Sequence, residues 1–177
     1  MEKIIANGAT ETIRTALSLQ SGCSEGDLNE LENEIREMTE EQDWTLPLEF
    51  RLLYRVFNGQ PLGMIDERNV QPLFGKVTVY DTIIAPYLLQ LDSIRKLIGV
   101  QHGRSESDFL GKGYLPIAVS SFRVQGRLIQ YYCDTNSGKI FTPRRDVRRD
   151  EFKGAFVISK SVQAFLELAV NISKYAV

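Results

Sequence analysis

Hydrophobic residues in the first third of the chain recur at helical spacing. In residues 24–43, four apolar side chains form one narrow stripe, which is typical of an amphipathic helix. Ser24 is a suitable N-cap, and acidic residues in the first turn complement the positive end of the helix dipole. The opposite face carries many carboxylates, which we interpret as a solvated surface, with an acidic docking face as the alternative. The apolar residues are Leu28, Leu31, Ile35 and Met38, and the acidic ones are Glu30, Glu32, Glu34, Glu37, Glu40 and Glu41.

Residues 46–60 predict a second helix with a much wider apolar surface. Pro47 suits the first helical turn, where its missing N–H would have no partner in any case. Apolar side chains cover more than half of the circumference, so we expect this helix to be buried. The Asn58-Gly59 pair is expected to end it in the left-handed conformation, which both residues tolerate. The apolar residues are Phe50, Leu52, Leu53, Tyr54, Val56 and Phe57.

The second half of the chain changes to the alternating pattern that is typical of strands. Helices are predicted at residues 9–19, at 88–97 and from Ser161 onward, where Val162 and Phe165 begin a new apolar stripe. Between two of the strands, Asn136 and Gly138 can take positive φ in a short loop, which predicts a β-hairpin. Helices, then antiparallel strands, then a helix indicate the α+β class rather than a βαβ arrangement. The predicted strands are residues 77–80, 114–119, 127–134 and 139–142, and residues 156–158 are either a last short strand or a lead-in to the closing helix.

The composition of the chain narrows its class. A length of 177 residues fits one domain, and 43% hydrophobic with 25% charged residues is ordinary for a globular protein. The net charge of -2 argues against a nucleic-acid partner. No apolar run approaches the roughly 20 residues that span a bilayer, and the N-terminus lacks the pattern of a secretory signal. The two cysteines, Cys23 and Cys133, form no CxxC pair, so we expect a reducing, cytoplasmic compartment, or a nuclear one in a eukaryote.

Residue types that carry catalysis are sparse. His102 is the only histidine, and no nucleophile motif accompanies it in the polar, glycine-rich segment 101–113. Phosphate-binding glycine motifs and EF-hand spacing are absent from the sequence, and Cys133 is interpreted as a buried structural thiol. We therefore predict no catalytic residue, no metal site and no cofactor. Two alternatives stay open: an enzyme that uses His102 or Cys133, and a small-molecule groove lined by Tyr131 or Tyr132, which point to opposite faces of a strand.

Four arginines gather directly after the predicted hairpin, in residues 143–150, together with Asp146 and Asp150. We interpret this segment as an exposed loop and, alternatively, as a surface for an acidic protein partner, because arginine pairs well with carboxylates and is enriched at interfaces. Partner contacts are predicted on the exposed face of the sheet and in segments 99–113 and 143–153. The candidate partner-binding residues are Arg144, Arg145, Arg148, Arg149 and Tyr131.

An ordered set of motifs resembles the SUKH superfamily, the Smi/Knr-like, cell-wall-assembly-regulator type. The set consists of an acidic helix followed by Leu-Pro, an aromatic-rich helix ending in Asn-Gly, a Leu-Pro-Ile-Ala strand, a hairpin with Asp and Gly at its turn, and a closing Ser-x-x-x-Phe-Leu helix. The version LPLEFRLLYRVFNGQ is most similar to the SUKH domain of eukaryotic F-box proteins in which an ApaG domain follows. These motifs lie at residues 24–43, 46–59, 115–118, 128–140 and 161–166.

The resemblance implies a fold with N-terminal helices packed on a single antiparallel sheet and closed by a C-terminal helix. It divides the chain into an N-terminal extension, residues 1–23, and a SUKH-like domain, residues 24–177. It also implies a non-enzymatic protein-binding role, as an adaptor or regulatory subunit, including one in a ubiquitin-ligase-type complex. The alternative that the family offers is a bacterial immunity protein that binds and neutralises a cognate toxin.

Overall fold

The computed structural model describes residues 20–59, 77–79, 82–84, 86–101, 113–124, 127–146, 151–162 and 164–165. Predictions that fall elsewhere, such as the helix at 9–19, lie outside the described residues. The described helices are α3 (Glu25–Thr39), α4 (Leu48–Val56) and α5 (Leu91–Gln101). The strands are β1 (Gln20–Ser21), β2 (Phe57–Asn58), β3 (Val77–Val79), β4 (Thr82–Ile84), β5 (Pro86–Leu88), β6 (Tyr114–Val124), β7 (Arg127–Asp134), β8 (Ile140–Asp146) and β9 (Glu151–Ser159).

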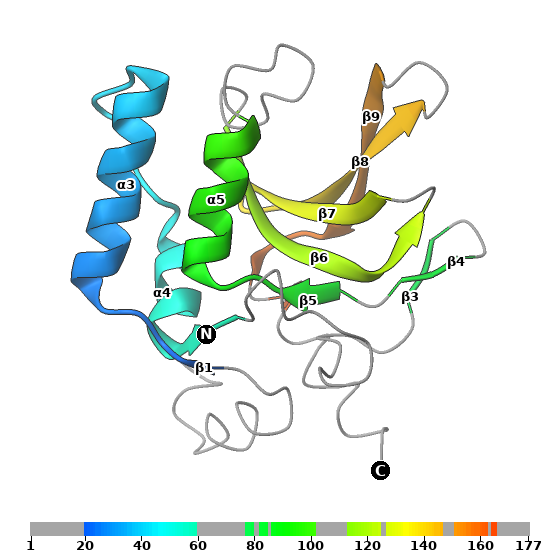
Figure 1. Cartoon of the computed structure of the whole chain (residues 1–177), viewed down its shortest axis with the longest axis horizontal. Helices are drawn as coiled ribbons and strands as arrows, with labels where there is room; N and C mark the ends of the chain where they lie inside the picture. Colours follow the sequence, from blue (N-terminus) through cyan, green and yellow to red (C-terminus); the bar gives the residue numbers. More distant parts are fainter. Residues whose placement is uncertain are drawn as a thin grey trace.

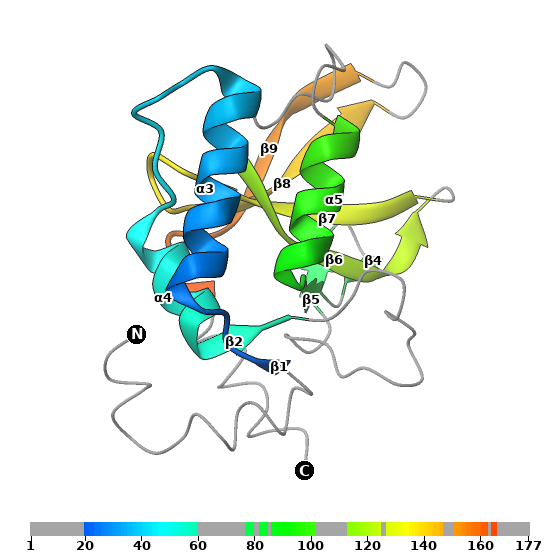
Figure 2. The ribbon, with the colours of Figure 1, turned by 60° about the vertical axis from the view of Figure 1, so that its left-hand side comes forward.

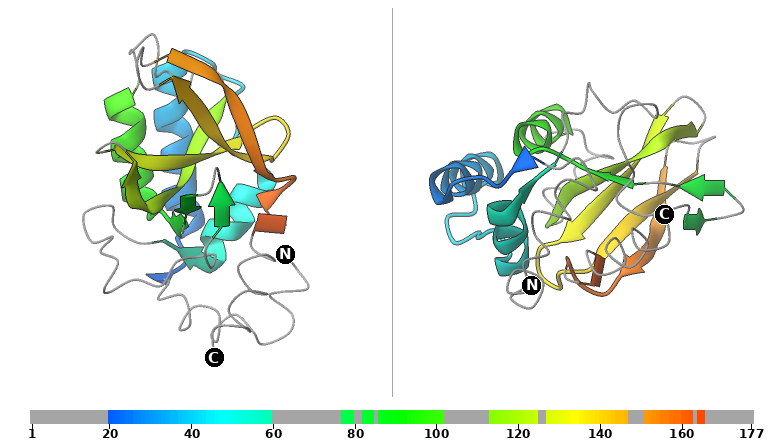
Figure 3. Two further views of the ribbon diagram at one scale, coloured as in Figure 1. Left: turned by 90° about the vertical axis from the view of Figure 1, so that its right-hand side faces the viewer. Right: turned by 90° about the horizontal axis from the view of Figure 1, so that it is seen from below.

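Five strands form one antiparallel sheet in the order β5-β6-β7-β8-β9, and α3, α4 and α5 lie together on one side of it (Figures 1 and 3). The main core fills the space between these layers, and the predicted α+β class is confirmed. Two short antiparallel pairs, β1-β2 and β3-β4, lie outside this sheet. None of the described helices is long and apolar enough to cross a membrane.

Helix α3 has the predicted apolar stripe and cap, but it ends at Thr39 rather than at residue 43, and Glu32, which was predicted on the solvated face, is buried. Leu28, Leu31 and Ile35 are fully buried in the core. Ser24 closes a capping box with Asp27: its hydroxyl oxygen accepts from the Asp27 N–H at 3.1 Å, and the Ser24 N–H donates to the Asp27 carboxylate at 2.8 Å. The C-cap is Glu40, which has a φ of 59° and is the non-glycine residue with positive φ among those described.

Helix α4 is buried as predicted, but its predicted end is wrong. Phe50, Leu53 and Tyr54 are fully buried, and the Tyr54 hydroxyl donates to the Leu89 carbonyl at 2.8 Å. Asn58 and Gly59 do not adopt the left-handed conformation, because the chain leaves the helix extended and Phe57–Asn58 pairs with β1. Gly59 is needed there for space, since a Cβ would lie 2.3 Å from the carbonyl oxygens of Leu88 and Leu89.

The β7-β8 hairpin is confirmed, with Gly138 at a φ of 69°, whereas Asn136 does not have positive φ. The predicted exposed loop at 143–150 is wrong in part. Its first residues, up to Asp146, belong to β8, and Arg145 pairs with Phe152 of β9. The strands of a hairpin pair through their backbones, whatever the charge of their side chains. A run of arginines is therefore no evidence for a loop. Strand β9 is correspondingly longer than the predicted 156–158.

Helix α5 begins at Leu91 rather than at residue 88, because Pro86–Leu88 pairs with β6. Its first turn is fixed by Asn58, whose side-chain oxygen accepts from the Leu91 N–H at 2.9 Å. At the other end of the chain, Val162, Ala164 and Phe165 are helical, and the Ser161 hydroxyl accepts from the Ala164 N–H at 3.0 Å, as the predicted cap requires.

Candidate functional site

The acidic residues of α3 divide into two groups. The first group lies in the first three turns and is engaged by arginines of α4 and α5. Arg51 of α4 donates to Glu25 and to Glu32, with both N···O distances at 2.6 Å. Glu32 also accepts from Arg36 at 2.6 Å and from the Leu46 N–H at 2.8 Å. These contacts tie α3, the chain before α4, and α4 to one carboxylate.

The electrostatics of Glu32 show that this network stabilises the folded state. Burial acts to raise the pKa of its carboxyl, but the Leu46 N–H and the guanidinium groups of Arg51 and Arg36 outweigh burial, so the pKa lies below its ordinary value. Asp27 likewise has a lowered pKa, mainly because of its hydrogen bonds with Ser24. These carboxylates are therefore part of the fold rather than free for a partner.

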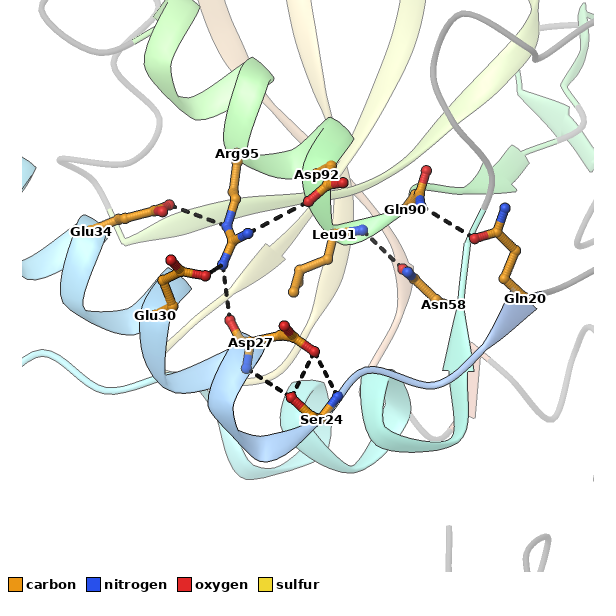
Figure 4. Close-up of polar contacts among 10 residues, drawn as sticks. All are labelled: Gln20, Ser24, Asp27, Glu30, Glu34, Asn58, Gln90, Leu91, Asp92 and Arg95. Carbon is orange, nitrogen blue, oxygen red and sulfur yellow. Dashed lines mark hydrogen bonds and ion pairs between the residues drawn. The ribbon is translucent and has the colours of Figure 1, made fainter.

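Arg95 of α5 makes the second connection to α3 (Figure 4). Its guanidinium lies 2.8 Å from Glu30, 3.3 Å from Glu34 and 3.5 Å from Asp92. It also donates to the backbone carbonyl of Asp27 at 3.1 Å. The buried Nε atom faces Glu34 without the alignment of a hydrogen bond, so that contact is electrostatic.

The second group of acidic residues lies at the last turn of α3 and in the chain that follows it. We call Glu37, Glu40, Glu41 and Asp43 the acidic end; all are exposed. Within the part of the chain that the structure describes, none of these four carboxylates has an ion-pair partner. Arg36, the basic residue of this turn, is already bound to Glu32 and to the Trp44 carbonyl, the latter at 2.7 Å.

The position of the acidic end in the fold strengthens its negative potential. Helices α3 and α5 run in the same direction, so their C-terminal ends lie at the same end of the helical layer (Figure 2). The C-terminus of a helix carries a partial negative charge, and the last turn of α5 has no basic residue to offset it. The C-terminal ends of α3 and α5 therefore lie on the same side of the helical layer, and the acidic end continues from that of α3.

The predicted contact Tyr131 is in the wrong place for a partner. It is 2% exposed in the main core, under the helices, and this corrects its assignment as a surface residue. Tyr132 does face the opposite side of the sheet, as alternation predicts, but it is fully buried and stacked on Phe141. Alternation shows which face a side chain takes and does not show what covers that face.

The predicted arginines are only partly described. Arg144 and Arg145 lie on β8, where the structure describes their backbone, and Arg148 and Arg149 lie outside the described residues. Their role in partner binding stays a prediction. His102 also lies outside the described residues.

The two thiols lie in environments that keep them protonated. Burial, with added effects of Asp27 and Asp92, raises the pKa of Cys23 to about 11. Burial also raises the pKa of Cys133 to about 12, and its side chain is fully buried. Neither group is a thiolate near neutral pH, which is the form that nucleophilic catalysis needs. Among the described residues, no group of three or more His, Cys, Asp or Glu side chains is arranged to hold a metal ion.

Sequence reasoning treated all the acidic residues of α3 alike and missed their arginine partners. One pair, Glu32 with Arg36, has the i,i+4 spacing that a helix brings together and could have been found. Arg51 and Arg95 come close to α3 only in the tertiary fold, so no local sequence pattern predicts their ion pairs with it.

No family model, no curated protein and no solved structure matches the chain. The resemblance to the SUKH superfamily therefore rests on the ordered motifs of the sequence.

Proposed function

We propose that this chain is a non-enzymatic protein–protein interaction module of the SUKH type, and that its partner presents a basic surface to the acidic end of α3. The order of elements supports the SUKH part of the proposal: helices α3 and α4, an antiparallel sheet, and the start of a closing helix at Ser161 follow one another as the resemblance implies. In this role the chain is an adaptor or regulatory subunit.

The observation that carries the proposal is that arginines pair with the carboxylates in the first three turns of α3, whereas those of the acidic end have no ion-pair partner among the described residues. A negative side chain in the last turn of a helix opposes the dipole, at a cost of about 0.3 to 1 kcal/mol, and nearby carboxylates repel one another. Basic residues at these positions would favour folding. Local violations of the folding rules are expected at functional sites, and clustered charge of one sign steers a partner of opposite charge.

Catalysis is the competing class of function. The high pKa values of Cys23 and Cys133 weigh against a thiol nucleophile. The test is replacement of His102 and of Cys133 with alanine in the native host. An unchanged phenotype for both variants leaves an enzyme without a candidate residue.

A bacterial immunity protein is the second candidate, because an acidic surface suits a basic toxin as well as a basic adaptor partner. Genomic context separates the two. A neighbouring gene for a polymorphic toxin supports immunity, and introns or a flanking F-box exon support the adaptor role.

The decisive experiment is affinity capture from the native host with three forms of the chain. One is wild type, and the second carries Glu37→Gln, Glu41→Gln and Asp43→Asn. The third is a matched control, Glu37→Asp, Glu41→Asp and Asp43→Glu, which keeps the charge and changes only side-chain length. The proposal predicts that wild type and control capture the same protein and that the neutral variant loses it. Equal capture by all three forms would show that Glu37, Glu41 and Asp43 do not bind the partner.

The arginine segment has its own test in the same assay. Reversing the charge at Arg144, Arg145, Arg148 and Arg149 together should weaken capture of a partner that also presents acidic groups to this segment, while the protein stays folded. Capture that survives this change would remove the segment from the interface and leave the acidic end as the candidate surface.

A further inference from the structure

No further inference is drawn: the strongest candidate, the aromatic cluster of Tyr114, Tyr132 and Phe141 on the sheet face opposite the helices, is an apolar face for which nothing in the described part of the structure shows what covers it.

Discussion

Acidic residues at the two ends of α3 lie in different environments. Near its start and middle, Glu25, Glu30, Glu32 and Glu34 are held by arginines from two other helices or from α3 itself. At the acidic end the carboxylates are exposed and, among the described residues, have no ion-pair partner. A glutamate is thus a structural residue where the fold brings an arginine to it, and a surface charge where the fold does not. Charge counted along the sequence cannot distinguish the two.

The largest difference between the two ends should appear when Glu32 is removed. Glu32→Ala leaves Arg36, Arg51 and the Leu46 N–H without their common acceptor. We expect the free energy of unfolding to fall by about 2 to 3 kcal/mol, less than for a fully buried pair because both arginines keep some contact with water. Urea unfolding measures this loss. The matched change Glu41→Ala should alter stability by less than about 0.5 kcal/mol. Equal losses for both variants would contradict the claim that only the paired carboxylate stabilises the fold.

Acid should weaken the paired part of α3 through the same residue. The folded-state pKa of Glu32 lies below its unfolded value, so the unfolded chain binds the proton more readily. Its contribution to stability is therefore full above the ordinary glutamate pKa of about 4.3 and is lost as the pH falls through the lower folded-state value. Stability measured from pH 6 to pH 3 should fall less steeply in Glu32→Gln than in wild type. Identical slopes for the two proteins would contradict the assignment.

The connection between α5 and α3 should be weaker than the one through Glu32. Arg95→Met removes a guanidinium whose carboxylate partners are 40% to 65% exposed. Because water and salt screen such contacts, we expect a loss of about 1 kcal/mol that shrinks at high ionic strength. Lys96→Met, at the exposed neighbouring position, is the control and should change stability little. A loss for Arg95→Met that is independent of salt would show that packing of its side chain, rather than charge, holds α5 to α3.

At the acidic end, replacing a glutamate should raise the free energy of unfolding instead of lowering it. Glu40 occupies a left-handed conformation, with a φ of 59°, that glycine adopts without steric cost. Glu40→Gly should therefore raise the free energy of unfolding by about 0.5 to 1 kcal/mol, since it relieves strain and removes a charge from the helix end. The control Glu37→Gly, inside the helix, should lower stability instead. A loss of stability in Glu40→Gly would show that the glutamate side chain makes a contribution at this position.

Much of this fold could be predicted from local sequence patterns, because residues close together in the sequence define its helices and turns. The stripe of Leu28, Leu31 and Ile35 and the Ser24 cap define α3, and Gly138 defines the hairpin turn. The end of α4 could not be predicted. Glycine is needed at position 59 because the backbone of Leu88 and Leu89 leaves no space for a Cβ, and these residues approach Gly59 only in the folded chain. A local turn rule cannot detect such a close approach.

The candidate site was predictable only as a surface rich in acidic residues. Which carboxylates are free depends on Arg51 and Arg95, and Arg95 is 65 residues from Glu30 in the sequence. The misplacement of Tyr131 has a similar cause: period-two alternation assigns it a face, but the three helices that bury that face come from other parts of the chain.

The most direct test of the account measures binding and stability on the same variant. Once capture has identified the partner, its Kd should be measured for wild type, for Glu37→Gln/Glu41→Gln/Asp43→Asn and for the charge-preserving control, at low and at physiological salt. We predict that the neutral variant binds about tenfold more weakly, with a reduced salt dependence, while its free energy of unfolding is equal to or higher than that of wild type. Unchanged affinity, or weaker binding that is explained by a loss of stability, would contradict the claim that the acidic end serves a partner rather than the fold.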